Sequence, residues 1–330
     1  MFKMRLFYYL MQIGASQILR KKREIAGGKS LDYVDRVNRA IDFILQHLDQ
    51  PLPLEVVAKA ASFSPFHFHR IFRLMVGESV SEFVKRLRLE RAVVLMSRRT
   101  WASRRHRSLT EIALACGFDS SSDFSRCFKQ RYGIPASRFD VGAFREKGRE
   151  ELRLASTEPR QRNLVNRLLP GENPDEFKVQ LRRLPQRSVA YLRVQDSFRE
   201  GAVLGAIDKL MAWAEARHLA SGKWLGYMWD DPEIVALSKC RYDVGLVVPP
   251  ATPGGEVSRL EFPEMQVAEV EIRGGIDLEM RALDWMFGTW LPQSGFVPTE
   301  QPCFEVWMGR PFAQGTEHFE LCLHVPVAGG

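Results

Sequence analysis

The sequence predicts a multidomain α and α+β protein: an all-α double helix–turn–helix domain, followed by an α+β domain of two pseudo-symmetric strand–helix–strand repeats. Three observations support this: a helix–turn–helix pattern that occurs twice, an internal repeat, and an uneven distribution of charge. Residues 1–150 contain 28 Lys and Arg against 15 Asp and Glu, whereas residues 151–330 contain 19 against 25. A basic half joined to an acidic half indicates a polyanion-binding module fused to a second domain.

Residues 1–30 are expected to form an N-terminal extension. Residues 6–13 are mostly apolar, but this run is far below the roughly 20 residues of a membrane span. A signal peptide is the alternative, although no clear cleavage site follows. The five cysteines are odd in number and form no CxxC or Cys/His cluster, which argues against a disulfide framework and a zinc site. We therefore expect a cytoplasmic protein with no cofactor, no metal and no membrane partner.

A helix–turn–helix pattern occurs twice within residues 31–147, the expected DNA-binding domain. Residues 52–79 and 108–135 each show a short helix with a small residue in its middle, a tight turn ending in Phe, a Ser cap and a second helix ending near a Gly. The small residues Ala58 and Ala113 allow the second helix to cross the first closely. This pattern is typical of motifs whose second helix enters the major groove of DNA.

Two further helices are expected around these units. Residues 33–48 carry apolar side chains on one face, and residues 80–97 form an amphipathic helix that joins the units. At ~1.5 Å per residue the joining helix spans about 27 Å, near the ~34 Å repeat of one DNA turn. A monomer would therefore present two recognition helices to adjacent major-groove segments.

Each recognition helix has a predicted core face and a predicted DNA face. Helical spacing turns four apolar side chains of the first unit inward, namely Phe68, Ile71, Phe72 and Met75. In the second unit Ser120 is the expected N-cap, and the core stripe consists of Phe124, Cys127, Phe128 and Tyr132. The residues expected on the DNA faces are Phe66, His69, Arg70, Arg73, Ser121, Ser122, Ser125, Arg126 and Lys129.

The chemistry of these side chains suits DNA recognition. Phe66 can contact a thymine methyl group, and Arg70 and Arg126 can each bridge a guanine edge. Arg73 and Lys129 suit phosphates, while the short hydroxyls of the second unit allow its helix to sit deep in the groove. A solvated helix face is the alternative interpretation.

Residues 98–108, between the two units, contain five arginines. A flexible polar loop is the alternative, but the position between two DNA-reading units favours phosphate contacts, with Arg104 and Arg105 as candidates. His67 and His69 form an HxH pair. On a helix these residues point to different faces, which argues against a metal site.

This region resembles the DNA-binding domain of the AraC/XylS family of transcription regulators. The segment LTEIALACGFDSSSDFSRCFKQRYGI is similar to the family signature, and FSPFHFHRIFRLMVGESVSEFVKRLRLERA is similar to the first unit and joining helix. The resemblance covers roughly residues 33–145. It implies double-stranded DNA as partner, RNA polymerase as a further partner, and base contacts from Phe66, His69, Arg70, Ser121, Ser122 and Arg126.

The second half contains an internal repeat after a polar linker expected at residues 148–176. Residues 179–197 align with 257–275 at a constant offset of 78, with Leu184-Pro185 matching Phe262-Pro263. Each copy shows two strands, a helix and a final alternating strand. Residues 177–327 are therefore expected to form a pseudo-two-fold α+β domain with a ligand site at its axis.

Aromatic residues and one carboxylate mark the candidate ligand site. Glu305 lies in an apolar strand, where the alternative is a solvent-facing position; an inward Glu305 would need a cationic or hydrogen-bonding partner. Aromatic faces beside a carboxylate favour a cation. The expected ligand-binding residues are Glu305, Trp307, Tyr227, Trp229, Trp285 and Tyr191.

This half resembles the GyrI-like small-molecule-binding domain found in multidrug-sensing regulators. The similar segments include LPQRSVAYLR, MWDDPEIVALSKCRYDVGLVV, FPEMQVAEVE, WLPQSGF and CFEVW. The resemblance implies a sequence-specific regulator, not an enzyme, whose effector is an aromatic or cationic small molecule near Glu305. A hydrolase of reactive small molecules and a protein-interaction module are the alternatives. Operator, effector, sign of regulation and oligomeric state are left open.

Overall fold

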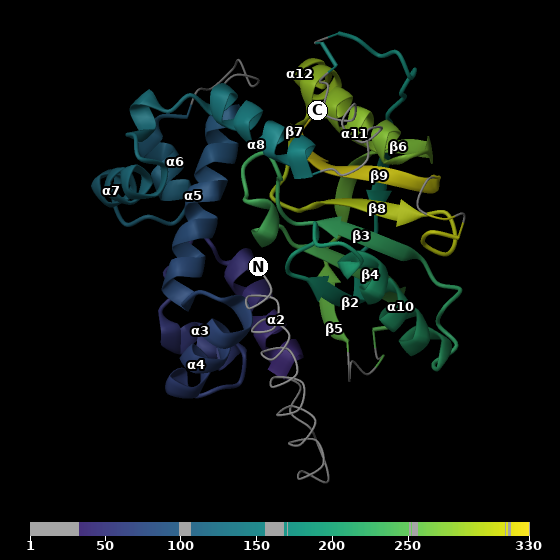
Figure 1. Cartoon of the computed structure of the whole chain (residues 1–330), viewed down its shortest axis with the longest axis horizontal. Helices are drawn as coiled ribbons and strands as arrows, with labels where there is room; N and C mark the ends of the chain where they lie inside the picture. The colour runs from purple at the N-terminus through teal and green to yellow at the C-terminus, as the bar shows by residue number, and fades with distance from the viewer. Residues whose placement is uncertain are drawn as a thin grey trace, which may run out of the picture.

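The computed structural model describes residues 33–98, 107–155, 168–169, 171–250, 252, 257–313, 315 and 318–329. A helical region lies on one side of the molecule and a large sheet with its own helices on the other, with α8 crossing between them (Figure 1). Within those ranges, none of the helices is both long and apolar enough to cross a membrane.

The helical region contains both predicted helix–turn–helix units. Its helices are α2 (Tyr33–Gln46), α3 (Leu54–Ala60), α4 (Pro65–Val76), α5 (Val80–Arg98), α6 (Leu109–Ala115), α7 (Ser121–Tyr132), the short η1 (Ala136–Arg138) and α8 (Val141–Ala155). Helices α3 and α4 form the first unit, α6 and α7 the second, and α5 joins them (Figure 1). The all-α double helix–turn–helix prediction is confirmed.

Local sequence signals explain the ends of these helices. Ser120 caps α7 by accepting a hydrogen bond from the Asp123 backbone N–H at 3.1 Å, as predicted. Ser108 and Glu111 form a reciprocal capping box at α6. Phe124, Cys127 and Phe128 are buried and Tyr132 packs on Phe128, so the predicted stripe is correct.

One inward position in α4 was predicted wrongly. Phe68 and Phe72 are buried, but Met75 is 38% exposed. Phe72 packs on Phe83 of α5, and in the last turn of α4 it is Val76, not Met75, that packs against this core. Helical spacing identifies the face of a residue, but it does not show where the facing surface ends.

The second half forms one nine-stranded sheet with the order β1-β6-β9-β8-β3-β4-β2-β5, and β7 pairs with β9 off this path. Every pairing is antiparallel. The strands are β1 (Gln180–Leu184), β2 (Arg187–Val194), β3 (Trp224–Met228), β4 (Tyr242–Val248), β5 (Ser258–Phe262), β6 (Met265–Gly274), β7 (Val297–Pro298), β8 (Cys303–Trp307) and β9 (Phe319–Ala328).

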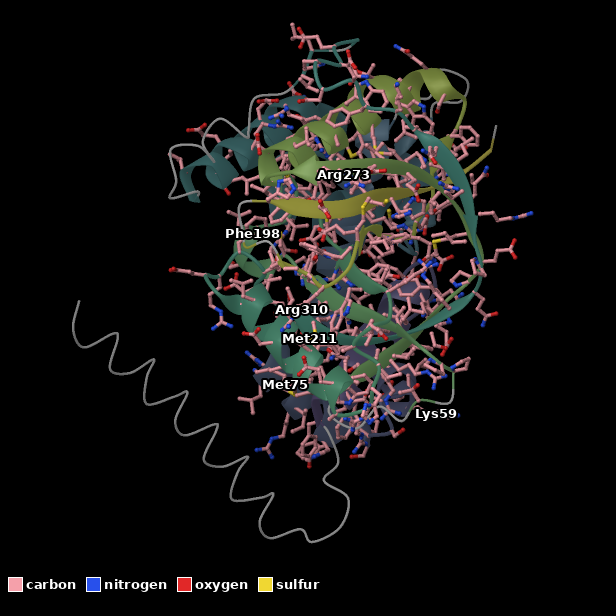
Figure 2. The ribbon with its side chains drawn as sticks, turned by 90° about the vertical axis from the view of Figure 1, so that its right-hand side faces the viewer. Lys59, Met75, Phe198, Met211, Arg273 and Arg310 are labelled. Carbon is pink, nitrogen blue, oxygen red and sulfur yellow. The ribbon has the colours of Figure 1, made fainter. Side chains whose placement is uncertain are left out.

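Helices cover one face of the sheet. These are α10 (Ala202–Glu215) and α11 (Ile276–Trp285), with α11 continuing through a π-helical turn, η4 (Met286–Trp290), into α12 (Leu291–Ser294). Side chains of α10, α11 and the sheet form one core. We call this the helix face; Figure 2 looks onto it, with Met211 marking α10 and Arg273 marking the end of β6.

The opposite face of the sheet turns toward α2, and we call it the α2 face. Asn38 of α2 donates a hydrogen bond to Ser258 of β5 at 3.0 Å. A second apolar core lies on this face and includes Val189, Leu225 and Phe304. The helical domain therefore packs directly on the sheet domain.

The predicted linker at residues 148–176 is shorter than expected, because α8 continues to Ala155. Arg149 of α8 forms ion pairs with Glu233 and Asp284 of the sheet domain, and these contacts stabilise the helix beyond its predicted end. Ile234 and Val235, from the loop after β3, complete the core of the second helix–turn–helix unit. The two domains therefore share part of their cores.

Candidate DNA-binding and ligand sites

The α4 recognition helix exposes its predicted DNA face. Phe66 is 77% exposed, an unusual position for a large aromatic side chain, and the Arg70 guanidinium lies 6.0 Å from the centre of its ring. Arg73 is exposed in the last turn, and His69 is half-buried. This face offers a flat apolar group and two cations to a groove.

The α7 recognition helix exposes a smaller and more polar surface. Ser121, Ser122, Ser125, Arg126 and Lys129 are all exposed. Asp123 accepts a hydrogen bond from Arg126 at 2.6 Å, which orients the guanidinium along the helix surface. Because Arg126 is exposed, this ion pair contributes little to stability and leaves the cation available to DNA.

The two recognition helices flank a hollow of about 410 Å³ centred on α5. Its lining includes His69 of α4, Lys85 and Arg88 of α5 and Asp123 of α7. Arg88 donates hydrogen bonds to the backbone oxygens of Leu48 and Gln50, so it ties α5 to the end of α2. Arg104 and Arg105, the predicted phosphate contacts of the loop, lie outside the described residues.

The predicted ligand-binding residues do not share one wall. Strands β3 and β8 are neighbours, and Gly226 lies directly opposite Glu305. Since successive side chains of a strand alternate between faces, Tyr227 points away from Glu305. Glu305 and Trp307 lie on the helix face, whereas Tyr191, Tyr227 and Trp229 lie on or beside the α2 face. Trp285 is on the helix face, where it packs on Phe177 at 5.7 Å.

Glu305 is buried in a cluster of polar groups on the helix face. It is 6% exposed, and its carboxylate accepts a hydrogen bond from the Tyr242 hydroxyl at 2.7 Å. The Glu279 carboxyl and the Trp307 indole also face it, and both act to lower its pKa. We call Tyr242, Glu279, Glu305 and Trp307 the carboxyl cluster. A solvent-facing Glu305 is thereby excluded.

Gly226 makes room for this cluster. A Cβ atom at this position would lie 1.8 Å from the Tyr242 hydroxyl oxygen and 2.6 Å from a Glu305 carboxylate oxygen. Any side chain at 226 would therefore displace the groups that hold Glu305.

The carboxyl cluster holds a proton near neutral pH. Burial raises the pKa of Glu305 to about 7. Burial, reinforced by the neighbouring Glu305 carboxylate, raises the pKa of Glu279 well above its ordinary value. Within the described chain, no Lys, Arg or His side chain perturbs either carboxyl, so protonation is the way this cluster limits its negative charge.

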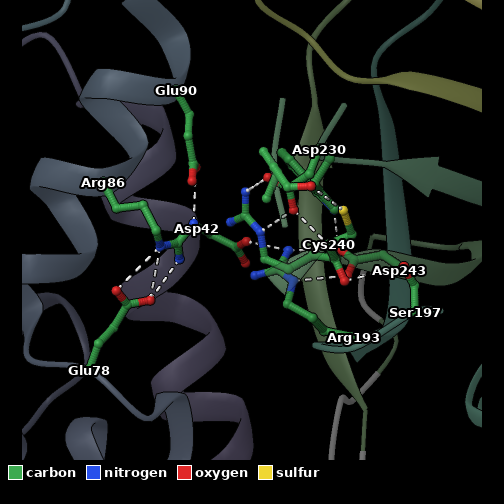
Figure 3. Close-up of polar contacts among 12 residues, drawn as sticks. Asp42, Glu78, Arg86, Glu90, Arg193, Ser197, Asp230, Cys240 and Asp243 are labelled. Atoms are coloured by element: carbon green, nitrogen blue, oxygen red, sulfur yellow. Dashed lines mark hydrogen bonds and ion pairs between the residues drawn. The ribbon is translucent and has the colours of Figure 1, made fainter. Parts of the chain in front are cut away.

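A second buried cluster, on the α2 face, joins the two domains. Arg193 of β2 forms ion pairs with Asp42 of α2 at 2.9 Å and with Asp243 of β4 at 2.6 Å. The Tyr191 hydroxyl donates to Asp42 at 2.5 Å, and the Trp229 indole donates to Asp243 at 2.6 Å. Figure 3 shows Arg193 between the two carboxylates. We call these five residues the Arg193 cluster.

Ion pairs along α5 and α8 add to this domain contact. Arg86 of α5 pairs with Glu78 and Glu90 (Figure 3). Lys239 of the sheet domain also pairs with Glu78. Burial raises the pKa of Glu90 to about 7. Arg145 of α8 reaches the loop after β3, and Arg149 reaches both this loop and α11.

The sequence patterns did not identify Glu279 or Tyr242 as site residues. They also did not predict that the five residues of the Arg193 cluster lie together. A signal for Glu279 exists, because it precedes Ala282 and Met286 by three and seven residues and so shares the apolar face of α11. Asp42 likewise lies on the buried face of α2, beside Ile41. The apolar patterns of α11 and α2 do not show which of these carboxylates pairs with a cation.

Comparisons with known proteins match both halves. A helix–turn–helix domain family matches residues 57–140, and the family of GyrI-like small molecule binding domains matches residues 177–328. The HTH-type transcriptional regulator YbfP of Bacillus subtilis is 31% identical over 153 residues, which cover 46% of this chain and 48% of YbfP. The chain therefore spans about half the length of that relative.

Two shorter relatives are covered almost completely. The regulatory protein SoxS of Salmonella typhimurium is 32% identical over 96 residues, covering 29% of this chain and 84% of SoxS. A DNA gyrase inhibitor of Edwardsiella piscicida is 32% identical over 160 residues, covering 46% of this chain and 98% of the inhibitor. The chain therefore belongs to the AraC-type helix–turn–helix transcription regulators and carries a GyrI-like small-molecule-binding domain after its DNA-binding domain.

Proposed function

We propose that this regulator binds double-stranded DNA through α4 and α7 and that an organic cation, bound at the carboxyl cluster, controls this binding. RNA polymerase is the proposed partner in transcription. The observation that carries the proposal is a buried pair of carboxyls for which the described chain supplies no cation, in a domain of a small-molecule-binding family.

The DNA half of the proposal rests on the exposed faces of the recognition helices. Arg70 and Arg126 can reach base edges, whereas Arg73 and Lys129 sit in the last turns, where they suit phosphates. The joining helix α5 has 19 residues, which at ~1.5 Å per residue corresponds to about 28 Å. Both faces can therefore meet one side of a DNA duplex.

The effector half of the proposal rests on charge. Buried carboxylates in proteins are normally paired with a cation or a metal. Glu305 accepts a hydrogen bond from the neutral Tyr242 hydroxyl, no Lys, Arg or His of the described residues perturbs it, and Trp307 adds an aromatic surface to its surroundings. A cationic ligand would supply the missing charge, and an aromatic face beside it adds roughly 0.5–2 kcal/mol.

Two covalent connections can transmit the occupancy of this site to the DNA-binding domain. Tyr242, which binds Glu305, precedes Asp243 of the Arg193 cluster directly in β4. Glu279 lies on the same helix as Asp284, which pairs with Arg149 of α8. A ligand that moves Tyr242 or α11 would thus act on α2 and α8, which pack against the two helix–turn–helix units.

DNA binding by the full chain tests the first half. A duplex selected by the protein from a random library is titrated at fixed salt by fluorescence anisotropy. Arg70→Ala and Arg126→Ala should each weaken the selected duplex by roughly 1–3 kcal/mol and leave random DNA almost unchanged. Arg183→Ala, an exposed position in the sheet domain, is the control. Equal losses on random DNA would show that these arginines only hold phosphates.

Effector control is tested in the same assay with phenyltrimethylammonium as the cation. Saturating ligand should change the affinity for the selected duplex by about 1–3 kcal/mol, the usual size of a coupling free energy. Glu305→Gln keeps the shape of the side chain and should abolish the change. An unchanged response in this variant would place the effector elsewhere.

A hydrolase is the second candidate function. Glu305 accepts a hydrogen bond from Tyr242, and such a carboxylate can act as a general base toward water. Mass spectrometry of an electrophilic ligand after incubation separates the candidates: recovery of the intact compound supports a sensor, and a product that gains one water and disappears with Glu305→Gln supports an enzyme.

A further inference from the structure

The carboxyl cluster contains two acids. Glu279 of α11 is 3% exposed, and Glu305 of β8 is 6% exposed and is the neighbouring charge that, after burial, most raises the pKa of Glu279. Two buried carboxyls that face each other without a cation are not both ionised at neutral pH, so the pair holds a proton, which we call the shared proton. Tyr242 of β4 is the remaining titratable group that faces the pair, and its hydroxyl donates to Glu305.

We propose that Glu279 is a second ligand-binding carboxylate and that it selects effectors whose cationic group carries N–H donors, such as amidinium or guanidinium ions. This inference rests on the proposed function, in which Glu305 binds a cation. Glu279 would make the binding of such a ligand an exchange: the shared proton leaves the cluster, and the ligand takes its place between the two carboxylates.

The selectivity follows from the hydrogen bonds. In the ligand-free cluster Glu305 interacts with Tyr242, Trp307 and the protonated Glu279. Loss of the shared proton leaves two negative charges in contact, and only a group that donates to both can hold them together. A planar amidinium has donors on two nitrogens and suits carboxylate oxygens, whereas a quaternary ammonium has none. The quaternary ion can therefore pair with Glu305 alone.

The exchange makes binding depend on pH. Since burial raises the pKa of Glu305 to about 7 and also raises the pKa of Glu279 well above its ordinary value, the ligand-free cluster carries at least one proton at neutral pH. A ligand that requires both carboxylates ionised must release protons, so its affinity rises with pH. A ligand that requires only Glu305 ionised releases fewer protons.

Two probes with the same ring and charge test this inference: benzamidine and phenyltrimethylammonium. Isothermal titration calorimetry of the full chain at pH 7, in two buffers with different ionisation enthalpies, measures affinity and proton release together. In the wild type we expect benzamidine to bind at least about tenfold more tightly and to release about one proton more than phenyltrimethylammonium.

Glu279→Gln is the decisive variant, because its amide can still donate a hydrogen bond to Glu305 but cannot ionise. The preference for benzamidine should fall to within about threefold, and the additional proton release should disappear, while phenyltrimethylammonium still binds. Glu279→Asp, which retains the charge, should keep the additional proton release. Glu264→Gln, an exposed position in the same domain, is the control and should match the wild type.

The outcomes are distinguishable. If neither probe binds the wild type, the proposed function itself fails, and this inference fails with it. If both probes bind and Glu279→Gln leaves their ratio and the proton release unchanged, Glu279 has only a structural role and the inference is overturned. A wild type that prefers phenyltrimethylammonium overturns it as well.

Discussion

The sheet buries two carboxylate clusters on its opposite faces, and they differ in one respect. On the α2 face, Arg193 supplies a cation to Asp42 and Asp243. On the helix face, Glu305 accepts a hydrogen bond from Tyr242, but no cation of the described residues perturbs Glu279 or Glu305. Tyr242 and Asp243 are consecutive residues of β4, so the clusters lie back to back across a single strand.

Because of this difference, we assign the Arg193 cluster to the stability of the fold and the carboxyl cluster to ligand binding. A buried ion pair between two parts of one chain holds those parts together, here α2 and the sheet. A buried carboxyl group that no cation of the protein contacts is stable in its protonated form or when a bound ligand supplies the positive charge. We therefore expect substitutions in the Arg193 cluster to affect folding and substitutions in the carboxyl cluster to affect binding.

The largest expected effect is that of Arg193→Met. This change leaves Asp42 and Asp243 buried without a cation and should lower the free energy of unfolding by about 3–5 kcal/mol. Urea unfolding followed by tryptophan fluorescence measures it, with the exposed Arg183→Met as control. A loss below about 1 kcal/mol, the range of surface ion pairs, would remove the contrast between the clusters.

The pH dependence of stability should be the next largest effect. Burial raises the pKa of Glu305 from 4.5 to about 7, so the folded protein binds this proton more tightly than the unfolded chain. The resulting stability is present below about pH 4.5 and is lost as the pH rises toward 7, a change of about 3 kcal/mol. Glu305→Gln should lose less stability than the wild type between pH 5 and pH 8 in urea unfolding. Identical pH profiles for the two proteins would contradict the buried acid.

Two glycines, one on each face, sharpen the comparison. A Cβ at Gly226 would lie 1.8 Å from the Tyr242 hydroxyl oxygen, and one at Gly245 would lie 2.8 Å from a Val189 methyl group. Gly226→Ala should weaken cation binding at least about tenfold because it displaces Tyr242. Gly245→Ala should cost about 1–3 kcal/mol of stability by overpacking and leave binding intact. Calorimetric titration and urea unfolding of both variants measure the two effects, and a reversed pattern would show that the ligand lies on the α2 face.

The smallest expected effect is that of Trp229→Phe. Trp229 donates to Asp243, which also accepts two hydrogen bonds from Arg193. Loss of the indole donor should therefore cost only about 1.5 kcal/mol, the low end for a hydrogen bond to a charged group. Ligand affinity should not change in fluorescence-independent titrations. A large loss of affinity would restore Trp229 to the ligand site, as the sequence alone predicts.

The DNA-binding half was predictable because its signals are local. Helical periodicity, the Ser120 cap and the small residue in each first helix all act within a few turns of one segment. The same reasoning failed at Met75, whose exposure depends on where the neighbouring surface ends. It also ended the domain before Arg149, whose partners lie far away in the sequence.

The ligand half was less predictable because strand partners set it. Strand alternation allowed either an inward or a solvent-facing position for Glu305. It could not show which face of the sheet the helices cover. The pairing of β3 with β8 places Gly226 opposite Glu305 and turns Tyr227 away. A grouping of aromatics by their nearness in the sequence therefore mixed residues from both faces.

The sequence by itself determined the helical and sheet domains, the helices α4 and α7 with their exposed polar faces, the Ser120 cap of α7, and the presence of a carboxylate in an apolar strand; the expected Ser cap of α4 was wrong, because the Ser64 side chain accepts no hydrogen bond from the helix. Tertiary structure decided which carboxylates meet a cation. Asp42 and Asp243 meet Arg193 because α2 packs on the sheet, whereas Glu279 and Glu305 meet each other because α11 covers its other face. The physical reason is range: periodicity and capping act between near neighbours in the sequence, but charge pairing depends on contacts between different elements, such as Asp42 of α2 and Arg193 of β2.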